Sequence, residues 1–578
     1  MDIAHLVLAS VGLLIALLAS GRVAPAMLFT GFAGAYYLTG LVDQRTLLAS
    51  YTNPALATLI LLLSVSLVLE RSPWIQRLSD ALLTGRPTVA IWRLGGFAGL
   101  CSAFLNNTAV VSALLGAVSR QRRMPASRLL LPLSYASVLG GITTLVGTST
   151  NLVVNSFVIG AGLPALGMFS FAAVGVPVAL LCLLALPLSA RLLPARKTGE
   201  EENRQSYLLE ARVVTGSPLA SRSIEANGLR NLDGLFLLEI ARNDHLISPV
   251  GPGEIVREDD VLVFTGAVRN IQALQRFPGL QVFGHHADAL LGANLVEVVV
   301  STESELDGRT LREVDFRTMF DAGVVGIRRG EKRLEGQLGR IPLRAGDSLL
   351  LAVGPDFAQH RNLDRNFRLV AGPALRPPLT DAQGRLALGG FAAVLAASAA
   401  GWLPLFDGLL VLLAVLLVRR LTTLSELRRR FPFELLMVIG SALAIARVIE
   451  SSGAGVLIAQ AMRAAFDGFG VWGALVGVYL ITLILTELVT NNAAAALAFP
   501  IGLSTAQAFG VDPMPFVMVV AYGASACFLM PSGYQTHLMV YSPGRYRLTD
   551  FLRAGLPISV LYSAGVLLLV PRVFPFAG

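Results

Sequence analysis

Charged side chains are scarce in this sequence: only 15% of its 578 residues are Asp, Glu, Lys or Arg. Soluble proteins carry nearer a quarter charged residues, so the composition argues against an ordinary soluble domain. Hydrophobic residues make up 54% of the chain, which favours a polytopic membrane protein in contact with the lipid bilayer. The net charge of +8 does not indicate a nucleic-acid partner, because basic residues of membrane proteins collect in cytoplasmic loops.

Cysteine is also rare, and its placement excludes two classes of site. Cys101, Cys182 and Cys527 all lie in apolar runs, which argues against a disulfide framework and against a metal cluster. The stretch Thr198–Pro378 contains no Gly-x-Gly-x-x-Gly, so it lacks the dinucleotide-binding fingerprint. The apolar runs show no nucleophile–base or metal-ligand constellation, so we expect no enzymatic activity and no organic cofactor.

Long apolar runs divide the chain into two membrane blocks around a soluble insert. A membrane-spanning helix needs about 17–25 apolar residues. The first block, residues 1–197, has runs at Ile3–Ser20, Val23–Val42, Pro54–Leu69, Leu129–Ile159 and Met168–Leu193. The second block, residues 379–578, has runs at Leu386–Trp402, Leu409–Val418, Pro432–Ile449, Pro515–Val540 and Ile558–Val570.

The insert repeats itself. "YLLEARVV" from Tyr207 parallels "NLVEVVVS" from Asn294, and "VREDDVLVFTG" ending at Gly266 parallels "LRAGDSLLLAVG" ending at Gly354. Such self-similarity predicts two copies of one small α+β unit, at 198–285 and 286–378. The pattern resembles tandem TrkA C-terminal (RCK C-terminal) domains, which implies either a scaffold or a regulatory role with a small ligand.

The two membrane blocks also correspond to each other. Each has about five spans plus one interrupted apolar stretch, which predicts re-entrant hairpins near 90–120 and 470–508. An odd number of spans inverts the second half relative to the first, as in inverted-repeat transporters. The loops Gly160–Leu166, Gly401–Gly408 and Phe509–Pro515 carry no Lys or Arg, so we expect them to face outward and the insert to face the cytoplasm.

Four polar stretches interrupt the apolar runs. They are "LNNTAVV" at Leu105–Val111, "VGTSTNLVVNS" at Val146–Ser156, "VTNNAAAALAFP" at Val489–Pro500 and "MPSGYQTHLMVYS" at Met530–Ser542. Asn107 precedes Thr150 by 43 residues, and Asn491 precedes Thr536 by 45. Interrupted helices at matching positions of two repeats are the best sequence indication of a transporter's binding site. One Asn pair alone would favour simple bonding between helices, but the matched pairs favour a site.

These four stretches resemble the hairpin tips and unwound-helix loops of the divalent anion/sodium symporter family, which includes citrate and sulfate permeases. The presence of the inserted TrkA-type pair implies the branch of this family that resembles sulfate permeases. The resemblance implies substrate contacts and two sodium sites at the tips. The implied substrate-binding residues are Asn106, Asn107, Thr108, Thr148, Ser149, Thr490, Asn491, Asn492, Ser532, Gly533 and Thr536. The implied sodium-binding residues are Ser102, Asn107, Gly147, Thr486, Asn491 and Pro531.

The sequence departs from the family pattern at several positions. Asn106 stands where the family often has Ser, and Asn492 where it often has Thr. His537 occupies the place that corresponds to Asn151, so the two ion sites are not expected to be fully symmetric. Glu487 lies one turn before the second tip, where an intramembrane acid is either a functional group or an interfacial partner of a basic residue. We expect the His537 imidazole to be packed in the protein interior and not to gain or lose a proton during transport.

These observations predict a sodium-coupled symporter of a small divalent anion, with sulfate favoured, that works by alternating access. The alternatives are a di- or tricarboxylate transporter, a proton-coupled exchanger that uses Glu487 or His537, and a ligand-gated ion channel. We expect the protein to lie in a bacterial-type inner (plasma) membrane. The family resemblance implies a homodimer.

Overall fold

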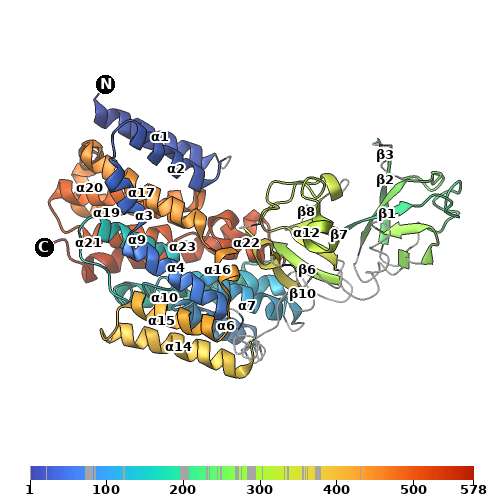
Figure 1. Ribbon diagram of the computed structural model, residues 1–578, viewed down its shortest axis with the longest axis horizontal. Coiled ribbons are helices and arrows are strands. Elements are labelled where there is room, and N and C mark those ends of the chain that lie inside the picture. The colour runs from blue at the N-terminus through green and yellow to red at the C-terminus, as the bar shows by residue number, and fades with distance from the viewer. Residues whose placement is uncertain are drawn as a thin grey trace.

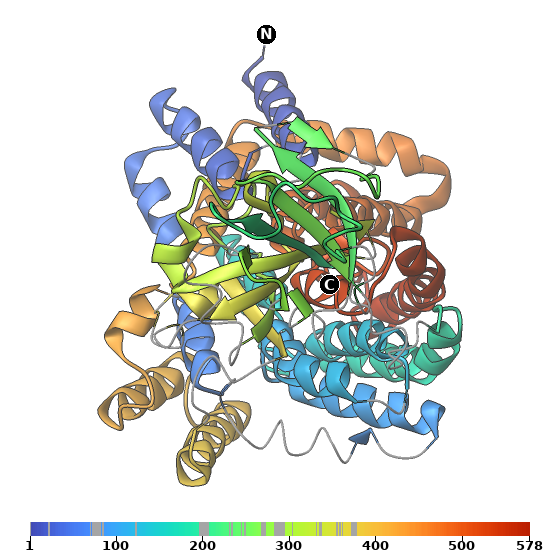
Figure 2. The same cartoon turned by 90° about the vertical axis from the view of Figure 1, so that its right-hand side faces the viewer.

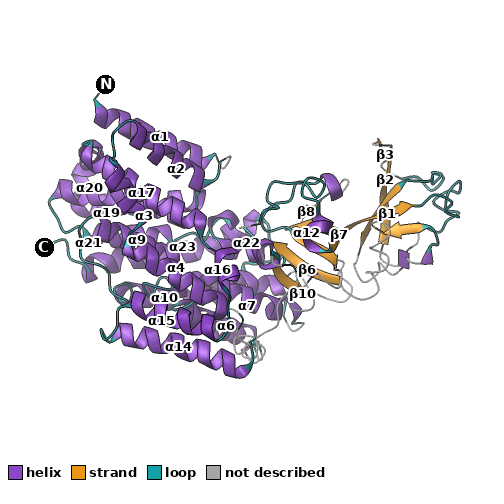
Figure 3. Cartoon of the chain, viewed as in Figure 1, coloured by secondary structure: helices purple, strands orange, loops and turns teal. Residues whose placement is uncertain are grey.

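The structure is a computed structural model with an elongated shape, helical at one end and β-rich at the other (Figures 1 and 3). Both chain termini lie at the helical end, away from the sheets (Figure 1). The described residues are 2–20, 23–69, 71, 82–83, 86–121, 124–195, 207–229, 232, 235–243, 245–247, 250–266, 273–274, 276–282, 295–302, 304–330, 332–334, 338–353, 357, 360, 362–371, 379–429 and 431–577. The predicted domain boundaries near 197, 285 and 378 lie outside these residues.

The helical end is built from both ends of the chain. The first block contributes α1 (Ile3–Ala19), α2 (Pro25–Leu38), α3 (Gln44–Tyr51), α4 (Pro54–Leu69), α6 (Pro87–Ser102), α7 (Asn107–Arg120), α8 (Leu130–Gly141), α9 (Ser149–Gly160) and α10 (Ala172–Arg191). The second block contributes α14 (Asp381–Ala399), α15 (Leu405–Val418), α16 (Leu424–Arg429), α17 (Phe433–Ser451), α18 (Ala454–Phe466), α19 (Gly470–Leu488), α20 (Asn491–Phe509), α21 (Met514–Ala524), α22 (Gln535–Tyr541) and α23 (Leu548–Val573).

Helix lengths agree with a membrane protein. Among the described residues, four helical stretches are long and apolar enough to cross a membrane: Gln44–Leu69, Ala172–Arg191, Gly470–Leu488 and Leu548–Val573. The prediction of a mostly helical membrane protein with a small β-rich region in its middle is confirmed. The amphipathic helix α18 was not predicted, because its 13 residues are too few for a span.

Buried tyrosines join the two membrane blocks. The hydroxyl of Tyr135 in the first block donates to the carbonyl of Phe528 at 2.8 Å, and that of Tyr522 in the second block donates to the carbonyl of Phe171 at 2.7 Å. Each hydroxyl provides the hydrogen bond that a buried carbonyl group needs where water has no access. Close contact of α6 with α8 depends on Gly140, where a Cβ atom would lie 2.0 Å from the Gly99 carbonyl oxygen.

The insert forms two five-stranded sheets that follow one plan. Domain 1 has strand order β3-β2-β4-β1-β5 and domain 2 has the equivalent order β8-β7-β9-β6-β10, with antiparallel pairing throughout. The strands are β1 (Tyr207–Val213), β2 (Leu235–Arg242), β3 (His245–Ile247), β4 (Val261–Gly266), β5 (Leu280–Val282), β6 (Leu295–Val300), β7 (Ala322–Arg329), β8 (Lys332–Arg333), β9 (Ser348–Val353) and β10 (Phe367–Ala371). Two short helices, α12 (Phe316–Phe320) and α13 (Leu363–Asn366), belong to domain 2.

Domain 2 lies next to the helical block and domain 1 lies beyond it, as seen along and across the long axis (Figures 1 and 2). The apolar cores of the two domains touch, because Val263 of domain 1 packs in the core of domain 2 and Leu350 of domain 2 packs in the core of domain 1. A carboxylate also crosses this boundary: Glu210 on β1 accepts a hydrogen bond from the N–H of Leu338. Burial raises the pKa of the Glu210 carboxyl to about 7.

The raised pKa of Glu210 predicts a pH-dependent contact between the two domains. Between its ordinary pKa and about 7 the folded state binds more protons than the unfolded state, so stability falls as pH rises through this window. Glu210→Gln keeps an acceptor for Leu338 but removes the charge. We expect the variant to exchange amide hydrogens in β1 more slowly than wild type at pH 8.

Hydrogen-exchange mass spectrometry of the full chain at pH 5 and pH 8 measures this difference. The exposed Glu225 of domain 1 gives the control variant Glu225→Gln, which should match wild type at both pH values. Equal exchange in Glu210→Gln and wild type at pH 8 would contradict the inference that a buried charge weakens the contact.

Candidate functional site

Four breaks in the helices coincide with the four polar stretches found in the sequence. The chain leaves helix between α6 and α7, between α8 and α9, between α19 and α20, and between α21 and α22. The first and third breaks are the predicted tips, and the second and fourth are the predicted loops. Non-helical backbone inside an apolar block needs polar partners, so the side chains at the breaks decide what the site can do.

At the first tip, Asn107 is almost fully buried and joins three elements. In the orientation that satisfies both ends of its amide, its nitrogen donates to Ser102 Oγ at 3.0 Å and to the Gly147 carbonyl at 3.3 Å. Its oxygen accepts a hydrogen bond from the Tyr534 hydroxyl at 2.7 Å. The structure therefore brings together Ser102, Asn107 and Gly147, the residues predicted for one sodium site.

The residues beside Asn107 shape this tip. Asn106 is the N-cap of α7, since its Oδ1 accepts from the N–H of Thr108 at 3.1 Å. The Thr108 hydroxyl in turn donates to Gln535 Oε1 at 3.1 Å. Thr148, the residue before α9, lies 3.3 Å from the Tyr534 hydroxyl through its Oγ1. The first tip and the second loop are thus joined by side-chain hydrogen bonds.

The second tip repeats the device with different partners. Thr486 stands five residues before Asn491, as Ser102 stands before Asn107, and its hydroxyl lies 3.1 Å from Asn491 Oδ1 and 2.5 Å from the Ala524 carbonyl. The Asn491 amide nitrogen contacts Cys527 Sγ at 3.5 Å. Thr490 caps α20 by accepting from the N–H of Ala493 at 3.4 Å.

The remaining predicted residues lie around these two tips. Asn492 Oδ1 accepts from Ser149 Oγ at 3.2 Å, which joins the second tip to the first loop. Pro531, Ser532 and Gly533 form a short 3₁₀ turn that packs against α19, the helix that carries Thr486. Of these three residues, Ser532 is exposed and Gly533 is buried.

His537 is packed, as expected from the sequence. Its side chain is fully buried, with Nε2 2.6 Å from the Cys527 carbonyl and Nδ1 2.7 Å from Ser134 Oγ. A carbonyl accepts only, so Nε2 carries the proton and Nδ1 accepts from the serine. Ser134 Oγ also lies 2.8 Å from Thr536 Oγ1, so the buried Thr536 of α22 bonds to α8 and, among the described residues, not to the asparagine tips.

Glu487 has a partner of a kind that the sequence did not suggest. Its two carboxylate oxygens accept hydrogen bonds from the N–H groups of Leu529 at 3.0 Å and Met530 at 2.9 Å. No basic side chain pairs with it among the contacts found in the described residues. The carboxylate therefore holds the start of the second loop against α19.

The chemistry of the site is that of neutral polar groups at helix starts. Helices α7, α9 and α20 begin at Asn107, Ser149 and Asn491, and helix N-termini carry partial positive charge. The predicted binding residues include no Lys or Arg, so backbone and amide dipoles replace formal cationic charge. Hydroxyl, amide and carbonyl oxygens at the same breaks are the ligand types that suit sodium.

Sequence reasoning missed Tyr534, Gln535 and Ser134. The first two lie inside the quoted stretch "MPSGYQTHLMVYS", so their position beside the matched residues was a usable signal. Ser134 lies in an apolar run more than 400 residues before its partner His537, and only the folded structure brings them together.

One cavity lies away from this site. It has a volume of about 910 Å³ and lies between α3, the end of α9 and α17. Its charged lining residues are Asp43, Arg45, Arg447 and Glu450, and Arg447 pairs with Glu450 at 3.2 Å. None of the predicted binding residues lines it, so the cavity is separate from the tips.

Comparison with known proteins finds transporters and a protein named as a regulator. The model of the citrate transporter family matches residues 5–523. A Chlamydomonas reinhardtii protein named for regulation of the sulfur deprivation response is 30% identical over 550 residues, 90% of this chain and 93% of that protein. The uncharacterised transporter sll0640 of Synechocystis is 30% identical over 561 residues, 93% of this chain and 91% of that protein. Sodium/sulfate cotransporter 1 of Chlamydomonas reinhardtii is 28% identical over 374 residues, 62% of this chain and 42% of that protein.

Packing around the first tip yields a test that needs no substrate. A Cβ atom on Gly141 would lie 2.6 Å from the nearer end of the Asn107 side-chain amide, whereas a Cβ atom on Gly96 would meet nothing within 4 Å. Gly141→Ala should displace the Asn107 amide and destabilise the protein by about 1–3 kcal/mol, typical of overpacking. Thermal unfolding of the purified protein in detergent should show a lower midpoint for Gly141→Ala.

The matched control is Gly96→Ala, which should leave the midpoint unchanged or raise it slightly, because alanine favours helix. If both variants unfold at the wild-type temperature, then Asn107 is not held against Gly141 as described.

Proposed function

Because the chain belongs to the citrate transporter family of secondary transporters, we propose that it is a symporter that carries sulfate together with sodium. The observation that carries this proposal is that hydrogen bonds from both tips meet at the start of α9, where Thr148 contacts the Tyr534 hydroxyl that bonds Asn107 and the neighbouring Ser149 bonds Asn492. Such a network offers N–H and O–H donors from several directions, as a small tetrahedral dianion requires. Sodium on the hydroxyl and carbonyl oxygens would offset the charge of the anion.

Sulfate is preferred as the substrate for two reasons. The predicted binding residues at the tips have small neutral side chains. They include no Lys or Arg that could pair with the two carboxylates of a longer substrate. A relative that matches 62% of this chain is named a sodium/sulfate cotransporter. A di- or tricarboxylate remains the second candidate, because the matching family is described as citrate transporters.

Each tip contacts the loop of the opposite half, and this supports alternating access. Asn107 contacts Tyr534, and Asn492 contacts Ser149, so neither half forms the site alone. In the proposed mechanism sodium orders the tips, sulfate binds between them, and the filled site is then exposed to the other side. The basic residues favour an insert that faces the cytoplasm. The TrkA-type identity of the insert and a homodimeric assembly are parts of this proposal too.

Uptake of labelled sulfate into proteoliposomes tests the proposal directly. An inward sodium gradient should accelerate uptake over an equal potassium gradient, and Asn107→Ala and Asn491→Ala should each lower the rate by about tenfold or more. Ser66→Ala is the control, because the buried Ser66 hydroxyl of α4 has no hydrogen-bond partner in the described part of the chain. Uptake that ignores the sodium gradient would refute the coupling.

Competition separates the two substrate classes in the same vesicles. Excess unlabelled succinate or citrate should leave sulfate uptake unchanged if sulfate is the substrate. Strong competition by either carboxylate, or carboxylate uptake without sulfate uptake, would favour the second candidate.

Glu487 distinguishes sodium coupling from proton coupling. Since both of its oxygens accept backbone hydrogen bonds, we expect Glu487→Gln to slow transport modestly by weakening the second loop. The sodium dependence and the pH profile of uptake should stay as in wild type. If the pH profile moves or disappears in Glu487→Gln, the proton-coupled alternative gains support at the expense of the sodium model.

A further inference from the structure

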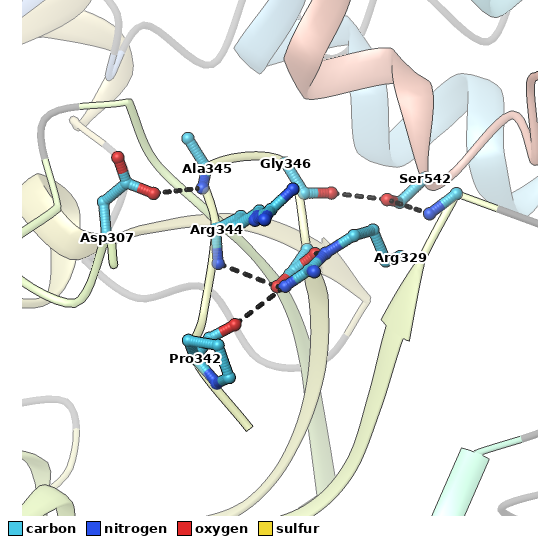
Figure 4. Close-up of polar contacts among 9 residues, drawn as sticks. Asp307, Arg329, Pro342, Arg344, Ala345, Gly346 and Ser542 are labelled. Carbon is cyan, nitrogen blue, oxygen red and sulfur yellow. Dashed lines mark hydrogen bonds and ion pairs between the residues drawn. The ribbon is translucent and has the colours of Figure 1, made fainter. Parts of the chain in front are cut away.

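Among its contacts with the helical block, domain 2 of the insert meets it at two turns and at one residue of β6. Ser542, at the end of α22, accepts a hydrogen bond from the N–H of Gly330 at 2.9 Å and donates one to the Gly346 carbonyl. Figure 4 shows this serine facing the turn that contains Gly346. Val299 of β6 is only 1% exposed and packs in the apolar cluster of the helical block.

Both turns have glycine where they meet α22. Gly330 and Gly346 have φ values of +55° and +88°, in the left-handed region. A Cβ atom on Gly330 would lie 2.8 Å from the ring of Tyr541, and one on Gly346 would lie 3.3 Å from the Leu538 carbonyl oxygen. A side chain at Gly330 would therefore require the Tyr541 ring or the turn of domain 2 to shift.

Domain 1 shows what these positions carry when no helix lies against them. The equivalent residues, 87 positions earlier, are Arg212, Asn243 and Asp259, and all three are exposed. Asn243 and Asp259 also have positive φ values of 45° and 63°, so both positions are left-handed in the two domains.

The two domains also share an Arg–Asp ion pair next to these turns. Arg329 pairs with Asp347 at 2.7 Å in domain 2, and Arg242 pairs with Asp260 at 2.8 Å in domain 1. Figure 4 shows Arg329 beside Pro342, whose carbonyl accepts from the guanidinium at 2.8 Å. The two copies therefore keep one framework and differ at the residues that meet α22.

The helix that domain 2 holds also reaches the proposed binding site. Helix α22 has seven residues, a length of about 10 Å, so its two ends lie close together. Tyr534, just before the helix, contacts Asn107, and Gln535 contacts Thr108. Ser542 at the other end contacts domain 2. In addition, α7, which starts at the first tip, lies against β10 of domain 2.

We propose that this face of domain 2, formed by Val299, Gly330 and Gly346, is a docking surface through which the insert controls transport. Docking orders α22, and the ordered helix keeps Tyr534 and Gln535 on the first tip. A change of state in the insert that loosens the docking surface would weaken the binding site. The consequence for transport rests on the proposed function, whereas the ordering of α22 does not.

The test replaces Gly330 of domain 2 by asparagine, the residue that domain 1 has at the equivalent position 243. Gly330→Asn puts a side chain against Tyr541, and asparagine tolerates the positive φ, so backbone strain is kept small. The matched control, Asn243→Gly, makes the reverse change in the exposed turn of domain 1. Hydrogen exchange of peptide 534–541 and sodium-driven sulfate uptake are measured on the same full-length preparations.

We expect Gly330→Asn to speed exchange in α22 and to slow uptake, each by about tenfold, while Asn243→Gly matches wild type in both. Ser542→Ala removes both hydrogen bonds without added bulk and replaces Gly330→Asn if that variant does not fold. Unchanged exchange of α22 in a folded variant would overturn the docking proposal. Faster exchange with wild-type uptake would overturn its control of transport.

The two proposals fail in different ways. Wild-type vesicles that take up no sulfate would contradict the proposed substrate, and the exchange comparison would still decide whether domain 2 orders α22.

Discussion

Hydrogen bonding of non-helical backbone inside an apolar block is the constraint on which this structure depends. Such backbone has no water to bond with, so each break must carry its own polar partners. Glu487 takes two N–H groups of the second loop, from Leu529 and Met530. Thr144 donates to the Ala103 carbonyl beside the first tip. A carboxylate and a hydroxyl that would be costly in lipid are therefore necessary here, because they stabilise the breaks that create the helix starts.

The breaks also explain why both membrane blocks are needed for one site. A tip that bonded only within its own half would leave the opposite loop unsatisfied. Instead Asn107 meets Tyr534 from the second half, and Asn492 meets Ser149 from the first. Tyr135 and Tyr522 add hydroxyl-to-carbonyl bonds across the same boundary. The halves are thus joined by polar contacts that have direction, and these define the geometry of the tips more sharply than apolar packing could.

Much of this arrangement could be predicted from the sequence, and the part that could not has a physical reason. Asparagine pairs in apolar runs and their spacing to the loops located all four breaks, because an amide in lipid needs an explanation. The sequence indicated that the site is asymmetric, since His537 stands where the first half has Asn151, but the partners of His537 and Glu487 were beyond sequence reasoning. His537 binds Ser134, a residue in an otherwise ordinary apolar run, and Glu487 binds backbone N–H groups, which leave no mark in a sequence. The first pair depends on the approach of the two halves, and the second depends on the folding of α19 against the loop after α21 within the second half.

The repeated insert carries information that neither its sequence nor its fold gives alone. In sequence, Gly330 and Gly346 are ordinary turn glycines, and Asn243 and Asp259 are ordinary turn residues that tolerate a positive φ. In the fold, the turns of the two domains are equivalent. The contact with α22 explains why glycine fits these turns in one copy, whereas the exposed turns of the other copy accept a side chain. A duplicated domain thus acts as its own control: the positions at which the copies differ mark the face that has acquired a partner.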